Sequence, residues 1–310
     1  MNVLCNNTMK KGIVFHYTSI DALRCLIDSV SKSKHKDSFL FQASNILFMN
    51  DPNEFYYGRK ILVRTLREIE DELGVLDEWR LSSLWSGNTL EEEKRKDIEY
   101  VQYLQNMKEI PFVLSFSLLE DSLPMWLNYG NHGKGVCLAL QDNREQPYLY
   151  RDTVQGKLPY ESFYTSDVFY DEIDKDSQLY KILYNTIKDY KDDIASNSLD
   201  NRDAYFDALL QTAVPFIKTM HYKSESEVRV SKTIRFHHYG EKNVAKFRCN
   251  KWGNLIPYID EEININQLKY IIWGPLVDFN LTKLAIDMMI GNVLNKKIDI
   301  LASNIQFREY

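Results

Sequence analysis

The chain has 310 residues, of which 44% are hydrophobic and 26% are charged, so it can bury a sizeable core. Its formal net charge of −6 argues against a protein that binds nucleic acid over its whole surface, because such binding depends on neutralising phosphates. No segment is apolar for long enough to be a signal peptide or a membrane span, which predicts a cytoplasmic protein.

The four cysteines, Cys5, Cys25, Cys137 and Cys249, are far apart in the sequence. Their spacing matches neither a dense disulfide framework nor a zinc site, so we expect reduced thiols. Cys25 and Cys137 lie in apolar segments and are expected in the core.

The first part of the chain alternates short strands with helical patterns. Strands are predicted at 12–16 and 39–43, with a helix at 20–30 between them and the turn Asn50-Asp51-Pro52 after them. Three helical patterns at 54–73, 76–85 and 90–107 predict a helical insertion at about 54–109. A strand at 111–118, a short helix at 123–129 and a strand at 133–140 follow.

The second part has a similar irregular alternation. Strand-like runs at 147–171 precede helices at 178–194 and 202–220, the second with a kink or break at Pro215. Strands are predicted at 225–235, 269–273, 298–302 and 305–307, and a helix at 281–294 has Asn280 as its expected cap. This order predicts one α+β domain over residues 1–310, with a mixed, mostly antiparallel central sheet and added helices.

Familiar nucleotide and hydrolase signatures are absent from the sequence. It contains no P-loop, no G-x-G-x-x-G and no G-x-S-x-G. These absences argue against an ordinary ATPase, a dinucleotide-fold dehydrogenase and a serine hydrolase.

Glu225, Glu227 and Arg229 are the most suggestive charged residues. On a strand, residues spaced by two point to the same face. Two carboxylates and a guanidinium on one face form a buried ion-pair cluster, line a cleft or lie on a solvated strand face. Charged groups that crowd together shift one another's pKa values, which can create acid and base roles.

Five local patterns occur in order along the chain. They are His16-Tyr17-Thr18-Ser19; Asn50-Asp51-Pro52-x-Glu54-Phe55; Ser115-Phe116-Ser117 followed by Asp121, Met125-Trp126-x-x-Tyr129-Gly130 and Gly133-Lys134-Gly135-Val136; Lys218-x-x-x-Tyr222-x-x-Glu225-x-Glu227-x-Arg229; and Ile271-Ile272-Trp273-Gly274-Pro275.

Together these patterns resemble a bacterial family, the domain of unknown function 2971 (DUF2971), over residues 16–275. Tyr222 stands where the family tends to have Trp, so an aromatic residue is kept. The helical region 56–110 carries no matching motif. Through this family the chain also resembles ADP-ribosyltransferases, which implies a split core of that type within the sheet.

The resemblance implies an enzyme that cleaves nicotinamide adenine dinucleotide (NAD) as its substrate, without a metal. Glu227 would stabilise an oxocarbenium-like transition state, and Glu225 would orient or deprotonate an unknown protein or nucleic-acid acceptor. A role as a toxin or phage-defence effector would fit such an enzyme. The implied dinucleotide-binding residues are His16, Tyr17, Ser115, Ser117, Trp126, Tyr129 and Arg229.

Two other functions remain open. The same scaffold could be a non-catalytic module that binds a nucleotide or a partner. A nuclease using Glu225, Glu227 and Asp51 with a divalent ion is disfavoured by the acidic net charge and the lack of a D-x-D motif.

Simpler structural interpretations also stand for single residues. His16 could be bonded to a backbone carbonyl, and Met125, Trp126 and Tyr129 have the spacing of a helix face in a core. A basic segment is either a nucleotide or nucleic-acid contact or a solvated hairpin. Its residues are Arg235, Lys242, Lys246, Arg248 and Lys251, with His221, His237 and His238 nearby.

Overall fold

The computed structural model describes residues 12–33, 37–85, 109–142, 161–196, 202–235, 245–250 and 253–306, together with residues 92, 95, 96, 98, 99 and 102. Its α-helices are α1 (Ile20–Ser29), α2 (Glu54–Leu73), α4 (Leu123–Asn128), α5 (Gln178–Ala195), α6 (Arg202–Ala213) and α7 (Phe279–Leu294). Its 3-10 helices are η1 (Val30–Lys32), η2 (Ile46–Phe48), η3 (Asp77–Trp79), η4 (Leu81–Leu84), η5 (Val214–Phe216), η6 (Met220–Glu225) and η7 (Ile265–Gln267).

The strands form one large, mostly antiparallel sheet. They are β1 (Ile13–Thr18), β2 (Ser38–Asn45), β3 (Glu109–Ser117), β4 (Val136–Gln141), β5 (Glu161–Asp167), β8 (Glu227–Arg235), β9 (Lys246–Cys249), β10 (Leu255–Asn264), β11 (Leu268–Trp273) and β12 (Asp299–Ala302). The order is β12-β11-β4-β1-β3-β2-β10-β9, with β8 branching from β3 and β5 pairing with β8. Among the described strands of this sheet, only β11 and β12 pair in parallel, and a separate parallel pair joins β6 (Phe169–Tyr170) to β7 (Ile217–Lys218).

Strand β3 lies at the centre of this arrangement because three strands pair with it. β8 pairs along its whole length, while on its other edge β2 pairs at Phe112 and Val113 and β1 pairs at Ser117. Alternate residues of β3 enter different cores: Phe112, Leu114 and Phe116 pack in one, and Val113 packs in another. The two faces of β3 therefore serve different layers of the protein.

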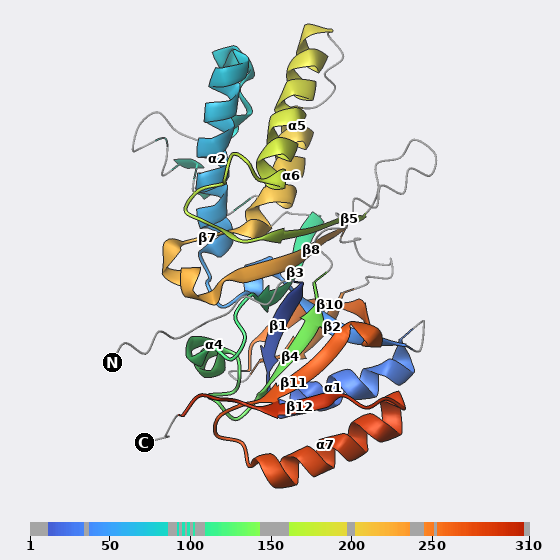
Figure 1. Ribbon diagram of the computed structural model, residues 1–310. Helices are drawn as coiled ribbons and strands as arrows, with labels where there is room; N and C mark the ends of the chain where they lie inside the picture. The colour runs from blue at the N-terminus through green and yellow to red at the C-terminus, as the bar shows by residue number, and fades with distance from the viewer. Residues whose placement is uncertain are drawn as a thin grey trace, which may run out of the picture.

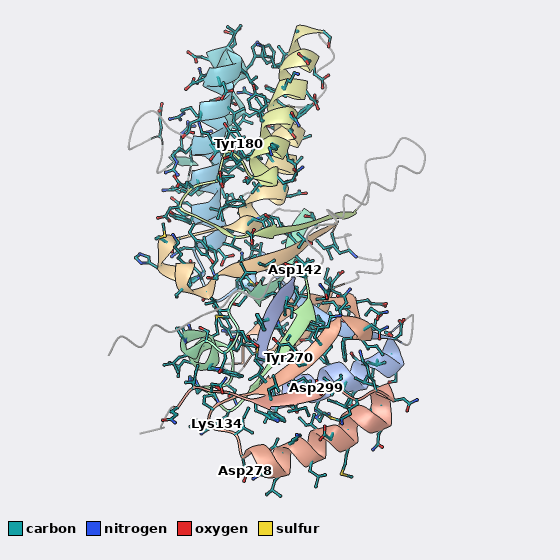
Figure 2. The ribbon with its side chains drawn as sticks, viewed as in Figure 1. Lys134, Asp142, Tyr180, Tyr270, Asp278 and Asp299 are labelled. Carbon is teal, nitrogen blue, oxygen red and sulfur yellow. The ribbon has the colours of Figure 1, made fainter. Side chains whose placement is uncertain are left out.

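Figure 1 shows these layers. Helices α1 and α7 cover the sheet on one side, and α2, α5 and α6 stand together as a helical layer on β3, β5 and β8. Figure 2 shows Tyr180 among the helices of that layer and Tyr270 on the main sheet. A smaller core around Phe15, Tyr17 and Trp126 lies under α4.

Gly58 fixes how closely α2 docks against η5. A Cβ built on Gly58 would lie 2.8 Å from Cγ1 of Val214. A larger residue would push α2 away, so glycine here lets the start of α2 approach the chain around Pro215. This close approach brings Glu54, the first residue of α2, against β8.

The structure confirms the α+β class with a mostly antiparallel sheet and corrects several predicted elements. Residues 76–85 form the short 3-10 helices η3 and η4 in place of a helical run, and the helix after 202 ends at Ala213, one residue before the Val214–Phe216 turn that holds Pro215. Most of 90–107 and all of 147–160 lie outside the described residues. Residues 305 and 306 are not in a strand.

Local chemistry explains two further corrections. α7 is capped by Asp278, whose Oδ1 accepts from the backbone N–H groups of Asn280 and Leu281, so Asn280 lies inside the helix (Figure 2). Cys137 is buried, as expected, but Cys25 is exposed on the outer face of α1. In the part of the chain that the structure describes, no helix has the length and apolar character needed to cross a bilayer.

Candidate functional site

A cluster of five buried charged side chains lies between the large sheet and the helical layer. Glu54, Lys218, Glu225, Glu227 and Arg229 expose between 0% and 6% of their surface. We call these five residues the buried ion cluster. Fully buried charges are rare in proteins unless they are paired, so the geometry of the pairs decides whether this cluster is stable.

The contacts in the buried ion cluster form a continuous chain. Arg229 Nε and Nη2 donate to the two carboxylate oxygens of Glu227 over 2.7 and 3.1 Å, and Nη1 donates to Glu54. Lys218 Nζ donates to Glu225 over 2.7 Å and to Glu227 over 3.0 Å. The two-bond pairing of Arg229 with Glu227 is the strong form of a carboxylate–guanidinium contact.

Different elements supply the members of the buried ion cluster. Glu227 and Arg229 are two residues apart on β8 and share one face, as predicted. Ser117 and Ser115 are their partners across the β3–β8 pairing. Glu225 departs from the prediction because it ends η6 and is not on the strand. Ser226, with φ of 42°, turns the chain between η6 and β8. This turn, and not strand alternation, points the Glu225 carboxylate toward Lys218.

Opposing effects set the charges in this cluster. Burial alone would raise the pKa of Glu227, but the positive charges of Arg229 and Lys218 outweigh it and lower the pKa to about 2. Burial likewise works against the charge of Lys218, yet Glu227 and the other carboxylates raise its pKa. Glu227 is therefore an ionised partner of two cations at neutral pH.

Hydroxyl groups surround the buried ion cluster. Tyr129 donates to Glu225 over 2.8 Å, and burial, followed by the charge of Glu225, raises the pKa of this tyrosine. Ser117 Oγ donates to the backbone carbonyl of Glu225 over 2.7 Å. Ser115 Oγ is buried and makes no hydrogen bond of good geometry. A weaker interaction of this hydroxyl with Glu227 still helps to lower the pKa of that carboxylate. Ser115, Ser117 and Tyr129 thus join Glu225, Glu227 and Arg229 in one place.

His16 does not join this group, and the expectation that it would converge with Ser115 and Glu227 is wrong. Its imidazole packs edge-on against Phe41 and Phe116, on the opposite face of the sheet, and Nδ1 contacts the backbone carbonyl of Ser115 at 3.1 Å. Burial lowers the pKa of His16, which keeps the ring neutral at pH 7. Side chains alternate between the two faces of a strand. Phe15 and Tyr17, the neighbours of His16 on β1, point to one face, so His16 points to the other.

Tyr17 and Trp126 are core residues in this structure. The two rings meet in a T-shaped contact with centroids 4.9 Å apart. Tyr17 donates to the carbonyl of Leu119, and Trp126 Nε1 donates to Asp121 over 2.8 Å. Both side chains are almost fully buried, so they stabilise the packing of α4 against β1.

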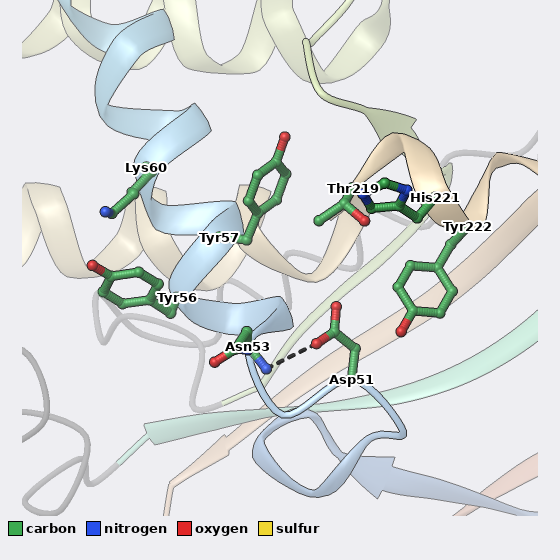
Figure 3. A pocket seen from close by; sticks show the side chains of 8 residues that line it. All are labelled: Asp51, Asn53, Tyr56, Tyr57, Lys60, Thr219, His221 and Tyr222. Carbon is green, nitrogen blue, oxygen red and sulfur yellow. Dashed lines mark hydrogen bonds between the residues drawn. The ribbon is translucent and has the colours of Figure 1, made fainter.

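A pocket of about 610 Å³ lies beside the buried ion cluster, because Tyr222 of its wall contacts Lys218. Figure 3 shows the side chains that line the pocket. We call it the α2–η6 pocket. Its wall is formed by the turn before α2, the first turns of α2 and the segment that begins η6. The lining residues are Asp51, Asn53, Tyr56, Tyr57, Lys60, Thr219, His221 and Tyr222.

Tyr222 separates the α2–η6 pocket from the buried ion cluster. Lys218 Nζ lies 4.4 Å from the centre of its ring, a cation–π contact. Burial, followed by the charge of Asp51, raises the pKa of the Tyr222 hydroxyl. One aromatic ring therefore stands between the pocket and the Lys218–Glu225 pair.

Asp171 fixes the distance between the two sides of the pocket. Its Oδ1 accepts from the Tyr57 hydroxyl of α2 over 2.5 Å and from the backbone N–H of Met220 at the start of η6 over 2.9 Å. Burial, and then the bond to Asp171, raises the pKa of Tyr57 to about 12, so its hydroxyl keeps its proton. Asp171 therefore ties the α2 side of the pocket to the η6 side.

The basic segment has an ordinary structural explanation where it is described. Lys246 pairs with Asp260, and Arg248 donates to Gln42 and to Ser44 Oγ, the latter over 2.7 Å. β9 pairs with β10, a strand that the sequence did not predict. The side chains of Arg235, His237, His238, Lys242 and Lys251 lie outside the described residues, and His221 lines the α2–η6 pocket instead.

Sequence reasoning missed part of the site. Asp51 and Glu54 were expected either in a simple turn or facing the cleft. Lys218 appeared in a motif but was not proposed as a site residue, and Thr219, Tyr56, Tyr57 and Lys60 carried no signal. Two patterns carried a signal: Asn50–Phe55 marks the turn that enters the pocket, and the pattern from Lys218 to Arg229 contains Tyr222 of its wall. Within the described ranges, no three His, Cys, Asp or Glu side chains group as a metal site.

The fold and the site define an α+β protein with a pocket beside a buried ion cluster. Residues 125–230 match the model of a family described as protein of unknown function (DUF2971), which confirms the predicted resemblance over that stretch. The match includes Tyr129, Lys218, Tyr222, Glu227 and Arg229, and it leaves out Glu54 and His16. Neither the curated proteins nor the solved structures contain a significant match.

Proposed function

We propose that the protein binds a nucleotide, NAD or a relative of it, in the α2–η6 pocket. The observation that carries this proposal is the composition of the pocket wall. Three tyrosines, a carboxylate and an ammonium group line a space of about 610 Å³, which is within the usual size of a small-molecule site.

Each part of a nucleotide has a chemical counterpart in this wall. Flat bases stack on aromatic rings such as Tyr222, whereas the ring of Tyr56 already contacts the ammonium of Lys60, 4.5 Å from its centroid. Lys60 supplies a positive charge for a phosphate, and Asp51 accepts hydrogen bonds from sugar hydroxyls. The pocket therefore offers contacts to the base, the sugar and the phosphate together.

Binding without turnover is the better-supported form of this proposal. Glu227 is buried, and both its oxygens are bonded to cations. A carboxylate that stabilises a reacting ribose must approach the sugar closely. Neither Glu227 nor His16 lines the pocket, so the dinucleotide roles implied for them have no counterpart in its wall.

ADP-ribosyl transfer remains the second candidate function, and one observation favours it. The Lys218–Glu225 pair lies directly behind Tyr222, one side chain away from the pocket. In this reaction the bond between the ribose and nicotinamide breaks, and the electron pair leaves with nicotinamide. An acceptor oxygen from a protein, a nucleic acid or water then bonds to the ribose and gives its proton to Glu225. A toxin or phage-defence role would belong to this candidate.

Calorimetry with NAD, combined with chromatography of the mixture, separates the two candidates. We expect saturable binding of NAD and no free nicotinamide. We also expect Lys60→Ala to weaken binding roughly tenfold, a change of about 1.4 kcal/mol, because the phosphate contact is lost. Lys181→Ala, which removes an exposed lysine of α5, is the matched control and should bind normally.

Two outcomes would change the conclusion. Release of nicotinamide by the wild type that is abolished in Glu225→Gln, while the variant still unfolds cooperatively on heating, would establish the enzymatic candidate. Absence of binding to NAD, AMP and ADP-ribose, or equal binding by the Lys60 and Lys181 variants, would reject the α2–η6 pocket as a nucleotide site.

A further inference from the structure

Thr219 carries a hydroxyl that the protein leaves without a partner. Its Oγ1 is buried and makes no hydrogen bond among the described residues, although Thr219 lines the α2–η6 pocket. Buried hydroxyls are nearly always bonded, and an unbonded one destabilises the folded chain. Such a group next to a pocket points to a partner that arrives with a ligand.

The backbone explains why this hydroxyl faces the pocket. Lys218 and Thr219 are consecutive residues in extended conformation, so their side chains point to opposite sides. Lys218 turns inward to the carboxylates of the buried ion cluster. Thr219 therefore turns outward, and Figure 3 shows its hydroxyl directed into the same space as the carboxylate of Asp51.

Asp51 complements Thr219 chemically. Its Oδ1 accepts from the backbone N–H of Asn53 over 2.9 Å, which fixes the carboxylate at the start of α2. A carboxylate has about four acceptor sites, so one such bond leaves capacity for a ligand. Asp51 can only accept when ionised, whereas a threonine hydroxyl both donates and accepts.

We propose that Thr219 is a specificity-determining residue that, together with Asp51, binds the two neighbouring hydroxyls of a ribose. This inference rests on the proposed nucleotide-binding function. One ribose hydroxyl donates to Asp51, and the next exchanges a hydrogen bond with Thr219 Oγ1. A ligand that lacks one of the two hydroxyls leaves a buried polar group unpaired, which is a strong basis for rejection.

The test compares stability and affinity in Thr219→Val and Thr219→Ser. Valine keeps the shape and removes the hydroxyl, so we expect Thr219→Val to melt at the wild-type temperature or above it while its affinity for NAD falls at least tenfold. Thr219→Ser keeps the hydroxyl and should bind within threefold of the wild type. The wild type should also bind AMP at least tenfold more tightly than 2′-deoxy-AMP, because either of the two contacts needs a ribose hydroxyl.

The failures of the two proposals are distinguishable. If the wild type binds NAD and Thr219→Val binds it equally well, the role of Thr219 is overturned and the nucleotide site stands. A lower melting temperature of Thr219→Val with unchanged affinity would show that the hydroxyl is structural. Equal affinity of the wild type for AMP and 2′-deoxy-AMP would overturn the assignment to ribose. If the wild type binds no nucleotide, the proposed function itself fails.

Discussion

Glu227 shows how single residues hold the site together. Its carboxylate is bonded to Arg229 on one side and to Lys218 on the other, in a space that solvent hardly reaches. A buried ion pair adds little stability compared with an apolar pair of the same shape, but removing one partner leaves the other charge uncompensated. The buried ion cluster therefore makes the fold sensitive to changes at any of its members.

The lowered pKa of Glu227 predicts a specific dependence of stability on pH. Its pKa is about 2 in the folded chain, against an ordinary value of 4.5. The ionised carboxylate stabilises the fold fully above pH 4.5, and this contribution, on the order of 3 kcal/mol, is lost as the pH falls from 4.5 to 2. We expect Glu227→Gln to be roughly 3–5 kcal/mol less stable than the wild type at pH 7 and to approach the wild type in acid.

Denaturant unfolding at several pH values measures this difference. Other carboxylates titrate in both proteins, so the gap between the two curves isolates Glu227. A gap that is constant from pH 7 to pH 3 would contradict the ionised, cation-paired state of Glu227.

The local sequence pattern predicted which residues share a strand face, but it did not predict their partners from distant parts of the chain. The spacing of Glu227 and Arg229 correctly predicted a shared face, because alternation on a strand is a local property. The partner of Arg229 could not be predicted in this way. Glu54 lies 175 residues away in the chain, and at the start of a helix it resembles an ordinary solvated first-turn acid.

At the scale of elements, the pocket depends on how α2 and η6 are held apart. Asp171 bridges them through the hydroxyl of Tyr57 and the backbone of Met220. Gly58 sets the depth at which α2 docks on the segment before η6. The pocket is therefore a product of contacts between elements and is not a feature of either one alone.

Removing the Tyr57 hydroxyl tests this bridge. We expect Tyr57→Phe to lower the free energy of unfolding by about 1–2 kcal/mol, because a hydrogen bond to a carboxylate is lost, and to weaken NAD binding. Tyr184→Phe on α5 removes the same hydroxyl away from the pocket and should change stability by less than about 0.5 kcal/mol. Unfolding curves and calorimetry of the two variants give both quantities. Equal behaviour of the two variants would show that Asp171 does not hold the pocket wall.

Elements with a strong internal period were predicted well from the sequence. The helix from Glu54 to Leu73 matches the predicted range, because its apolar residues recur at helical spacing and Gly74 ends it with φ of 66°. Strand β8 begins two residues later than predicted, because Ser226 adopts a left-handed conformation that alternation does not reveal. Turns of this kind depend on tertiary contacts.

At the scale of the whole molecule, the order of strands decided which candidate residues meet. β3 pairs with β8 on one edge and with β1 and β2 on the other, so Ser115 and Ser117 of β3 lie beside Arg229 and Glu227 of β8. His16 of β1 packs on the far face of the sheet. The sequence predicted the α+β class and a mixed sheet, but it contained no information on the register between β1 and β3. A shift of the strand pairing by one residue turns every side chain of a strand to the other face of the sheet. The predicted position of His16 was wrong for this reason.

The central claim is that a nucleotide binds between α2 and η6, beside the buried ion cluster. Hydrogen–deuterium exchange of the full chain, with and without saturating NAD, tests it most directly. We predict slower exchange in residues 50–60 and 218–226, because a ligand there covers both walls of the pocket. Unchanged exchange in both segments, or protection confined to residues 13–18 around His16, would contradict the account.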